Sequence, residues 1–389
     1  MFLIPPGGLE QRRKRCEPEV QKLSGLTWET VTSCNLCSSR RSITISLADR
    51  YGLPAHTVLC MDCGLLYLAD CLTVKSYSEF YSRGFYRSIC SQFNNVRHSI
   101  DQIQADQRNY ARTLSAVVAR YMPGRGAGRL LDVGGSTGIV TSEFVKKFSM
   151  SGTVLDPAEE EVAAARALGL HAVVGSVEDY QTDETYDLIL LCRSVEHLMD
   201  LSGALARIRK LLKPGGLFYC DIADFMELCQ QVGAPETVTK VDHRYWLTKE
   251  TAVNIFHMLG FEPVSMDIMQ GFGYAGYLLR TCEPAMRIDF PAERVLQFIE
   301  QIHRIQLDWK ESGRASRGIV GELRYRAYRM KRAALRFAGR GRQSQEKNPL
   351  RPSVAPSSVV TLQRSPIEEP ASPESIPAKR RGAASGSKP

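Results

Sequence analysis

Apolar residues in the middle of the chain form short runs that alternate with amphipathic stretches between residues 129 and 280. Short apolar runs are typical of buried strands, and apolar residues spaced three or four positions apart are typical of helices packed on one face. Their alternation indicates βαβ units, so we expect an α/β fold with a largely parallel sheet and helices on both faces. The predicted strands are 130–133, 152–155, 172–174, 186–192, 217–222, 263–269 and 274–280, and the predicted helices are 139–148, 159–168, 201–212 and 249–259.

The sequence on either side of this region differs in composition and in the spacing of its apolar residues. Residues 76–125 are rich in Tyr, Gln and Asn and end in an amphipathic pattern from 103 to 121. Apolar residues at 295–309 predict another helix, and an Arg-rich helix is predicted at 322–337. After Gly339 the chain holds eight of its 19 prolines and few large apolar groups, so we expect disorder there.

These differences in apolar pattern and composition predict six segments. They are an N-terminal extension (1–30), a cysteine-bearing module (31–75), a helical and aromatic connector (76–125), the α/β domain (126–285), C-terminal helices (286–338) and a disordered basic tail (339–389).

Charge and composition narrow the class of protein. The net charge is +8, but residues 310–389 carry 18 basic and 6 acidic residues, which leaves 32 basic and 36 acidic residues elsewhere. The folded part is therefore mildly acidic, which argues against a general nucleic-acid binder. No apolar run approaches the roughly 18 residues of a transmembrane helix. With no export signal, we expect a cytoplasmic protein with reduced cysteines.

A glycine-rich turn follows the first predicted strand, in the run L-L-D-V-G-G-S-T-G from Leu130 to Gly138. Glycines allow a ligand to approach the backbone closely. The turn lacks the Gly-x-Gly-x-x-Gly spacing of nicotinamide sites and the Gly-Lys-Ser/Thr of phosphate loops. Asp156 follows the second strand, where an acidic residue in such folds meets a ribose diol. The turn and Asp156 together predict a nucleoside-type ligand at the carboxyl ends of the strands.

Four segments in this order resemble class I S-adenosylmethionine-dependent methyltransferases. They are L-L-D-V-G-G-S-T-G, V-L-D-P, Y-D-L-I-L-L-C-R-S-V-E-H-L and L-L-K-P-G-G-L-F. The resemblance implies a Rossmann-like sheet and an S-adenosylmethionine-dependent enzyme. It implies cofactor contacts from Asp132, Gly134, Gly135, Ser136, Gly138, Asp156, Pro157, Ser176, Val177, Cys192 and Arg193. Ser136 replaces the middle glycine of the family loop, and Ser176 stands where the family often has Asp, so that Glu178 or Asp179 is the alternative contact at the adenine edge.

Two Cys-x-x-Cys pairs precede this region, with 22 residues between them. Such pairs are typical of structural four-cysteine zinc sites. We therefore predict one zinc ion held by Cys34, Cys37, Cys60 and Cys63. The stretch is also similar to the zinc-ribbon start of bacterial methyltransferases of sugar and polysaccharide biosynthesis, which implies a sugar, nucleotide-sugar or polysaccharide-linked acceptor and O- or C-methylation. The further C-terminal domain of sugar C-methyltransferases is not evident here.

Methyl transfer often needs a base that removes a proton from the acceptor, and histidine suits this role. His243 lies in the long connection after the fifth strand, and His197 follows the fourth strand. We expect His243 to be the base, with His197 as the alternative. Tyr77, Tyr81 and Tyr86 could form a lid over the cofactor or simply pack the cysteine module against the sheet.

Two other functions stay open. One is an RNA methyltransferase that binds through the zinc module and the basic tail; the absence of an Asn/Asp-Pro-Pro-Tyr motif disfavours it. The other is a non-catalytic cofactor-binding module. The sequence leaves the acceptor atom, the oligomeric state and the role of the tail undecided.

Overall fold

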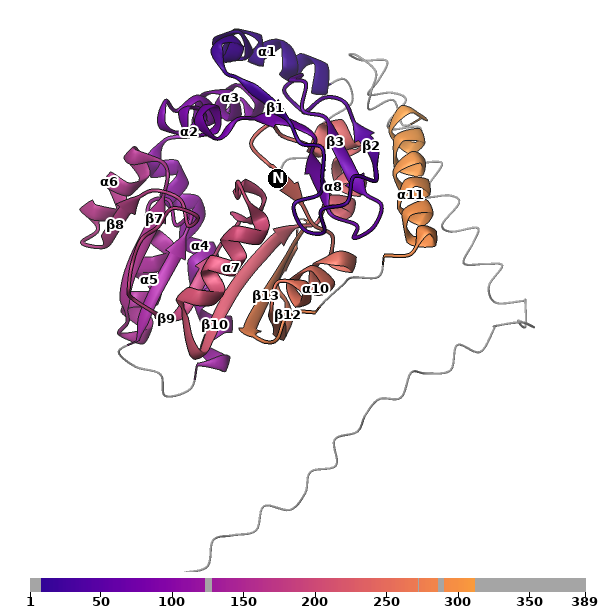
Figure 1. The fold of residues 1–389 in the computed structure, drawn as a ribbon. Coiled ribbons are helices and arrows are strands. Elements are labelled where there is room, and N and C mark those ends of the chain that lie inside the picture. Colours follow the sequence, from indigo (N-terminus) through magenta and orange to yellow (C-terminus); the bar gives the residue numbers. More distant parts are fainter. Residues whose placement is uncertain (1–7, 123–127, 272, 286–289, 312–389) are drawn as a thin grey trace, which may run out of the picture. The chain divides into compact units, whose positions relative to one another are not determined.

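The computed structural model describes residues 8–122, 128–271, 273–285 and 290–311 (Figure 1). The predicted helix at 322–337 and the predicted disordered tail lie outside these residues. No helix in the described part of the chain is both long enough and apolar enough to cross a membrane.

The main sheet has seven strands in the order β12-β13-β10-β9-β6-β7-β8. Strands β10, β9, β6, β7 and β8 run parallel, and β13 is antiparallel to both of its neighbours. The bounds are β6 (Arg129–Val133), β7 (Ser151–Asp156), β8 (His171–Val174), β9 (Tyr186–Leu191), β10 (Leu212–Ala223), β12 (Phe261–Gly271) and β13 (Tyr274–Thr281). The chain moves outward in opposite directions from β6, which puts a topological switch point between β6 and β9.

Both faces of this sheet are buried, because successive side chains of a strand point to opposite faces. On one face, Leu130 and Leu188 pack with α4 (Ile100–Val118) and α5 (Ile139–Phe148). On the other, Leu131 and Ile189 pack with α7 (Leu201–Leu211) and α10 (Lys249–Met258). Helix α6 (Glu159–Ala167) covers β7 and β8 at the sheet edge. The predicted α/β fold with helices on both faces is confirmed.

The cysteine-bearing region forms two small sheets. Strands β1 (Trp28–Thr30) and β5 (Asp70–Leu72) pair with each other. Strands β2 (Ser42–Ser46), β3 (Thr57–Cys60) and β4 (Leu66–Leu68) form a second sheet, whose fourth strand is β11 (Tyr245–Trp246). Strand β11 belongs to the connection between β10 and α10, so the α/β domain contributes an edge strand to the cysteine module.

The remaining described helices were only partly predicted. Helix α11 (Ala292–Glu311) lies where its apolar spacing predicts, with Val295, Phe298, Ile302 and Trp309 buried. Helix α1 (Gly8–Lys22) was not predicted, because four consecutive basic residues and Pro18 hide the weak spacing of Cys16, Val20 and Leu23. Also unpredicted are α2 (Val74–Ser82), α3 (Phe85–Asn94), α8 (Phe225–Val232) and α9 (Pro235–Val238).

Candidate functional site

The glycine turn joins β6 to α5 at the carboxyl edge of the sheet. Gly134, Ser136 and Gly138 all have positive φ, at 69°, 50° and 76°. A Cβ at Gly134 would lie 2.4 Å from Ser194 Oγ, so a larger residue would collide with the segment after β9. Ser136 adopts the left-handed conformation despite its side chain, which fits its role as the non-glycine member of the turn.

Two buried carboxylates flank this turn. Asp132 accepts a hydrogen bond from Thr141 Oγ1 at 2.7 Å, while its Oδ1 is buried without a partner among the described residues. Asp156 accepts from the backbone N–H groups of Ser136 and Ala158, each at 2.9 Å. Burial raises the pKa of both carboxyl groups to about 7. A ligand that brings positive charge or hydroxyl donors would favour their ionised forms.

The donor set fits S-adenosylmethionine. Each Asp156 oxygen uses one lone pair on a backbone amide, which leaves the other for a ribose hydroxyl. The buried negative charge of Asp132 would be offset by the sulfonium and ammonium groups. Gly135 has no Cβ above Asp132, and one added there would lie 2.8 Å from Cγ. The bound cofactor supplies an activated methyl group.

The other predicted cofactor residues also lie at this edge. Pro157 is half-buried beside Asp156, and Val177 is buried. Ser176 donates to Asp179 Oδ2 at 3.2 Å. Glu178, the alternative adenine contact, instead accepts from the backbone N–H of Met199 at 3.0 Å, so Oε1 of its carboxylate anchors the start of α7.

Cys192 and Arg193, which the resemblance predicts to form the floor of the site, follow β9. The Arg193 guanidinium lies over the rings of Tyr110 and Tyr274, 4.9 Å and 4.7 Å from their centroids. Its backbone N–H donates to buried Asp221 at 2.5 Å. Asp221 also accepts from Tyr110 Oη at 2.8 Å. A cation is thereby held in place at the strand ends.

The two predicted catalytic histidines come together although they are far apart in sequence. The rings of His197 and His243 are 4.5 Å apart and nearly perpendicular. His197 lies in the short helix η3 (Val195–His197), and His243 lies just before β11. Lys240 and Asp242 complete the group, with Lys240 Nζ 2.9 Å from Asp242 Oδ2. Burial lowers the pKa of His197 to about 4, although the nearby Asp242 carboxylate acts to raise it. Burial also lowers the pKa of His243 well below its usual value.

Three tyrosines of α2 and α3 tie these helices to the strand-end loops. Tyr77 Oη donates to the carbonyl oxygens of His197 and Asp242, at 2.8 Å and 3.0 Å. Tyr81 Oη lies 2.7 Å from His197 Nδ1. Tyr86 Oη donates a hydrogen bond to the buried Glu161 carboxylate of α6. The connector helices therefore contact both the His197 side and the Asp156 side of the site.

The cysteine module holds the segment that carries His243. Asp49, fully buried, accepts from the Val241 N–H at 2.9 Å and from the N–H groups of Tyr51 and Leu53. The Leu68 N–H donates to the Arg244 carbonyl at 3.0 Å. Tyr245 and Trp246 then pair with β4. Sequence reasoning missed Asp49 and Lys240, because no motif links either residue to the site.

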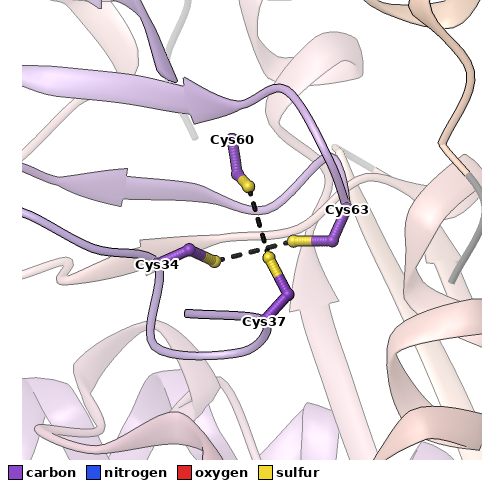
Figure 2. Close-up of side chains that lie close together, drawn as sticks. All are labelled: Cys34, Cys37, Cys60 and Cys63. Atoms are coloured by element: carbon purple, nitrogen blue, oxygen red, sulfur yellow. Dashed lines mark hydrogen bonds between the residues drawn. The ribbon is translucent and has the colours of Figure 1, made fainter. Parts of the chain in front are cut away.

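The four predicted zinc ligands converge, as Figure 2 shows. Cys34 and Cys37 come from the loop after β1, and Cys60 and Cys63 from the turn between β3 and β4. The sulfur atoms of Cys34 and Cys63 are 3.6 Å apart, as are those of Cys37 and Cys60. A tetrahedral zinc with Zn–S bonds of about 2.3 Å places its sulfurs roughly 3.8 Å apart. The cluster therefore fits such an ion.

Comparison with known proteins identifies the central region. Residues 106–266 match the family model of a methyltransferase domain. The chain is 32% identical over 98 residues to the ubiquinone biosynthesis O-methyltransferase of Bradyrhizobium sp. (strain ORS 278), which is 23% of this chain and 37% of that protein. It is 28% identical over 132 residues to an uncharacterized methyltransferase of Schizosaccharomyces pombe, 30% of this chain and 47% of that protein. The chain thus spans less than half the length of these curated relatives.

Solved structures give weaker likenesses. One is an S-adenosylmethionine-dependent methyltransferase from Clostridium acetobutylicum, with 14% identity and a TM-score of 0.37 over 44% of this chain and 92% of that one. Another is the glycopeptide N-methyltransferase MtfA complexed with S-adenosylmethionine, with 16% identity and a TM-score of 0.35 over 44% and 94%. Residues 106–266 therefore match a methyltransferase domain, and the seven-stranded sheet has a Rossmann-like α/β arrangement.

Proposed function

We propose that this chain transfers a methyl group from S-adenosylmethionine to a small-molecule acceptor. The observation that carries the proposal is the assembly of Asp132, the glycine turn and Asp156 at one edge of the sheet. That assembly offers two carboxylates and a turn without obstructing side chains to a ligand with a ribose diol and a positive charge.

For the acceptor we propose a sugar, a nucleotide sugar or a polysaccharide-linked group, methylated on oxygen or carbon. The order of a four-cysteine module followed by the methyltransferase domain supports this class. Zinc in the cluster of Cys34, Cys37, Cys60 and Cys63 would then be structural, since four thiolates complete a closed tetrahedral shell. A histidine beside the cofactor, His243 or His197, would take the proton of the acceptor.

The test has two steps on the full chain. Calorimetric titration with S-adenosylmethionine measures binding, and a protein that binds none would refute the proposal. Transfer of a labelled methyl group is then screened against a panel of nucleotide sugars and against total RNA. Labelled nucleotide sugar is the expected result, whereas labelled RNA with unlabelled sugars would contradict the proposed acceptor class. Cofactor binding without transfer to any acceptor would favour a binding module.

A further inference from the structure

The hydrogen bonds of His197 fix which of its ring nitrogens carries the proton. Nδ1 lies 2.9 Å from the backbone carbonyl oxygen of Asp242 and 2.7 Å from Tyr81 Oη. A carbonyl oxygen can only accept, so in the neutral ring Nδ1 carries the proton and donates it. The Tyr81 hydroxyl is then directed to Asp242 Oδ2, 3.4 Å away. This arrangement satisfies the three groups together and leaves the ring's lone pair on Nε2.

Nε2 of His197 is also the nitrogen that is open. The described residues provide no hydrogen-bond partner for it, and the side chain of His197 is 29% exposed. His197 is therefore a neutral imidazole with a free lone pair that an acceptor can reach.

His243, by contrast, has no ring nitrogen with a free and accessible lone pair among the described residues. Its Nε2 lies 3.0 Å from Lys240 Nζ. An ammonium group only donates hydrogen bonds, so it occupies the lone pair of Nε2. The proton is then on Nδ1, which is buried without a partner among the described residues. His243 as a whole is only 8% exposed, so neither nitrogen is available as a base.

Asp242 holds Lys240 in this position. Its Oδ2 is 2.9 Å from Lys240 Nζ and 3.7 Å from His197 Nδ1. Burial opposes the charge of Lys240, but the Asp242 carboxylate keeps the pKa of Lys240 above its ordinary value. The buried ion pair of Lys240 and Asp242 therefore contacts both histidines, Lys240 at His243 and Asp242 at His197.

His197 also lies next to the cofactor turn. Its helix η3 begins directly after Ser194, whose Oγ donates to the Cys192 carbonyl at 2.9 Å and lies 3.5 Å from the Gly134 carbonyl oxygen. Glu196, its chain neighbour, accepts from the Ala223 N–H at the end of β10 at 2.5 Å. Helix η3, which carries His197, therefore lies at the carboxyl ends of β9 and β10, beside the turn proposed to hold the methyl donor.

We propose that Nε2 of His197 is the proton acceptor in the reaction, and that Lys240, Asp242 and Tyr81 are positioning residues. This inference rests on the proposed methyl transfer to a hydroxyl group. The hydroxyl proton passes to Nε2, whose lone pair forms the N–H bond. The oxygen forms the new bond to the methyl carbon, while the electron pair of the broken C–S bond stays on sulfur. The imidazolium, close to Asp242, then releases its proton to solvent.

The first measurement needs no acceptor. In the full chain labelled with ¹⁵N-histidine, nitrogen chemical shifts report which ring nitrogen of each histidine is protonated. His197 should carry its proton on Nδ1, with an unprotonated Nε2. Diethyl pyrocarbonate, which modifies unprotonated imidazole nitrogen, should label His197 at least tenfold faster than His243, as read by peptide mass spectrometry. A proton on Nε2 of His197, or faster labelling of His243, would overturn the assignment.

Two matched variants supply the second measurement. In His197→Asn the amide N–H replaces Nδ1–H but nothing replaces Nε2, and in His243→Gln the amide oxygen can still accept from Lys240. With a nucleotide sugar found in the screen, His197→Asn should slow methyl transfer by roughly 10²–10⁴-fold, and His243→Gln should slow it less than His197→Asn does. Both should bind S-adenosylmethionine as the parent does. The reverse ranking would overturn this inference alone, whereas a parent chain that binds no S-adenosylmethionine would overturn the proposed function as well.

Discussion

The two halves of the candidate site are built in different ways. The cofactor half comes from one βαβ unit, in which Asp132, the glycine turn and Asp156 lie within 25 residues of each other. The acceptor half joins Tyr81, His197 and Asp242 from three segments separated by more than forty residues at each step. A single local turn shapes the first half, while the second exists only when the cysteine module, the connector helices and the sheet pack together.

This difference predicts how each half responds to damage. Changes inside the βαβ unit should alter cofactor affinity and leave the histidine cluster in place. Changes in the cysteine module should disturb the histidine cluster and leave cofactor affinity unchanged. The reason is that this module holds the 239–246 segment through Asp49 and through the pairing of β4 with β11. The following experiments test this separation.

Loss of the proposed zinc should have the largest effect. Structural zinc contributes about 10–16 kcal/mol in zinc-finger peptides, so Cys60→Ser should release the metal and unfold the module. Hydrogen exchange should then increase at residues 57–68 and 239–246 before it increases in β6 and β7. Metal analysis should fall from one zinc per chain to none. Cys282→Ser, outside the cluster, is the control, and a metal-free parent with native exchange rates would disprove the zinc site.

Asp156→Ala should weaken S-adenosylmethionine binding by roughly 1.5–3 kcal/mol, because charge-assisted hydrogen bonds to the ligand are lost. Calorimetry measures this change, and the histidine tautomers should be unaltered. Asp183→Asn, on an exposed residue that precedes β9 and has no predicted cofactor contact, serves as the matched control. Unchanged affinity in Asp156→Ala would mean that the ribose contact lies elsewhere.

Asp49→Asn should damage the acceptor half alone. An amide offers one acceptor oxygen where the carboxylate receives three backbone N–H groups, so the free energy of unfolding should fall by about 1–3 kcal/mol. Exchange should rise at Val241 and its neighbours, with S-adenosylmethionine affinity unchanged. Asp70→Asn, a substitution at a partly exposed position of the same module, controls for the loss of one charge. Equal effects of the two substitutions would argue against a specific support by Asp49.

The smallest expected effect is a pH dependence of cofactor binding. Burial raises the pKa of Asp132 and Asp156 to about 7 in the free protein. Hydroxyl donors and positive charge on the ligand favour the carboxylates, so binding should release protons and tighten as pH rises through about 7. Because the pKa of both carboxyl groups is raised, the folded state binds more protons than the unfolded state below about pH 7. The free energy of unfolding of the free protein should therefore fall as the pH rises toward about 7.

Calorimetry in phosphate and in Tris, which differ in ionisation enthalpy, measures the released protons. An affinity that stays constant from about pH 6 to pH 8 would show that neither carboxylate changes its charge on binding. Cofactor binding by the Asp156→Ala variant should release fewer protons than binding by the parent.

Most of the fold could be predicted because its signals are local. The helix at 139–148 was predicted with the bounds that α5 has, since Gly138 marks its start and its apolar spacing is regular. The helix capped by Thr248 was likewise predicted, and the structure has the Thr248–Thr251 capping box. By contrast, α1, α8 and α9 went unpredicted, because their burial depends on partners far away in the chain rather than on a strong pattern of their own.

The sequence by itself determined the cofactor turn and the cysteine cluster as groups of residues, because in both cases the chemistry requires fixed short spacings. Only the tertiary structure decided that His197 and His243 share one cluster and that Lys240 occupies the lone pair of His243. It also decided that Asp49 supports the 239–246 segment, which carries His243. The physical reason is that hydrogen bonds select the tautomer and the free nitrogen of His197, and these bonds join residues up to 161 positions apart. The bond between Asp49 and Val241 joins residues 192 positions apart. Spacing along a chain carries no information about such contacts until the packing of the sheet, the module and the connector helices brings the groups together.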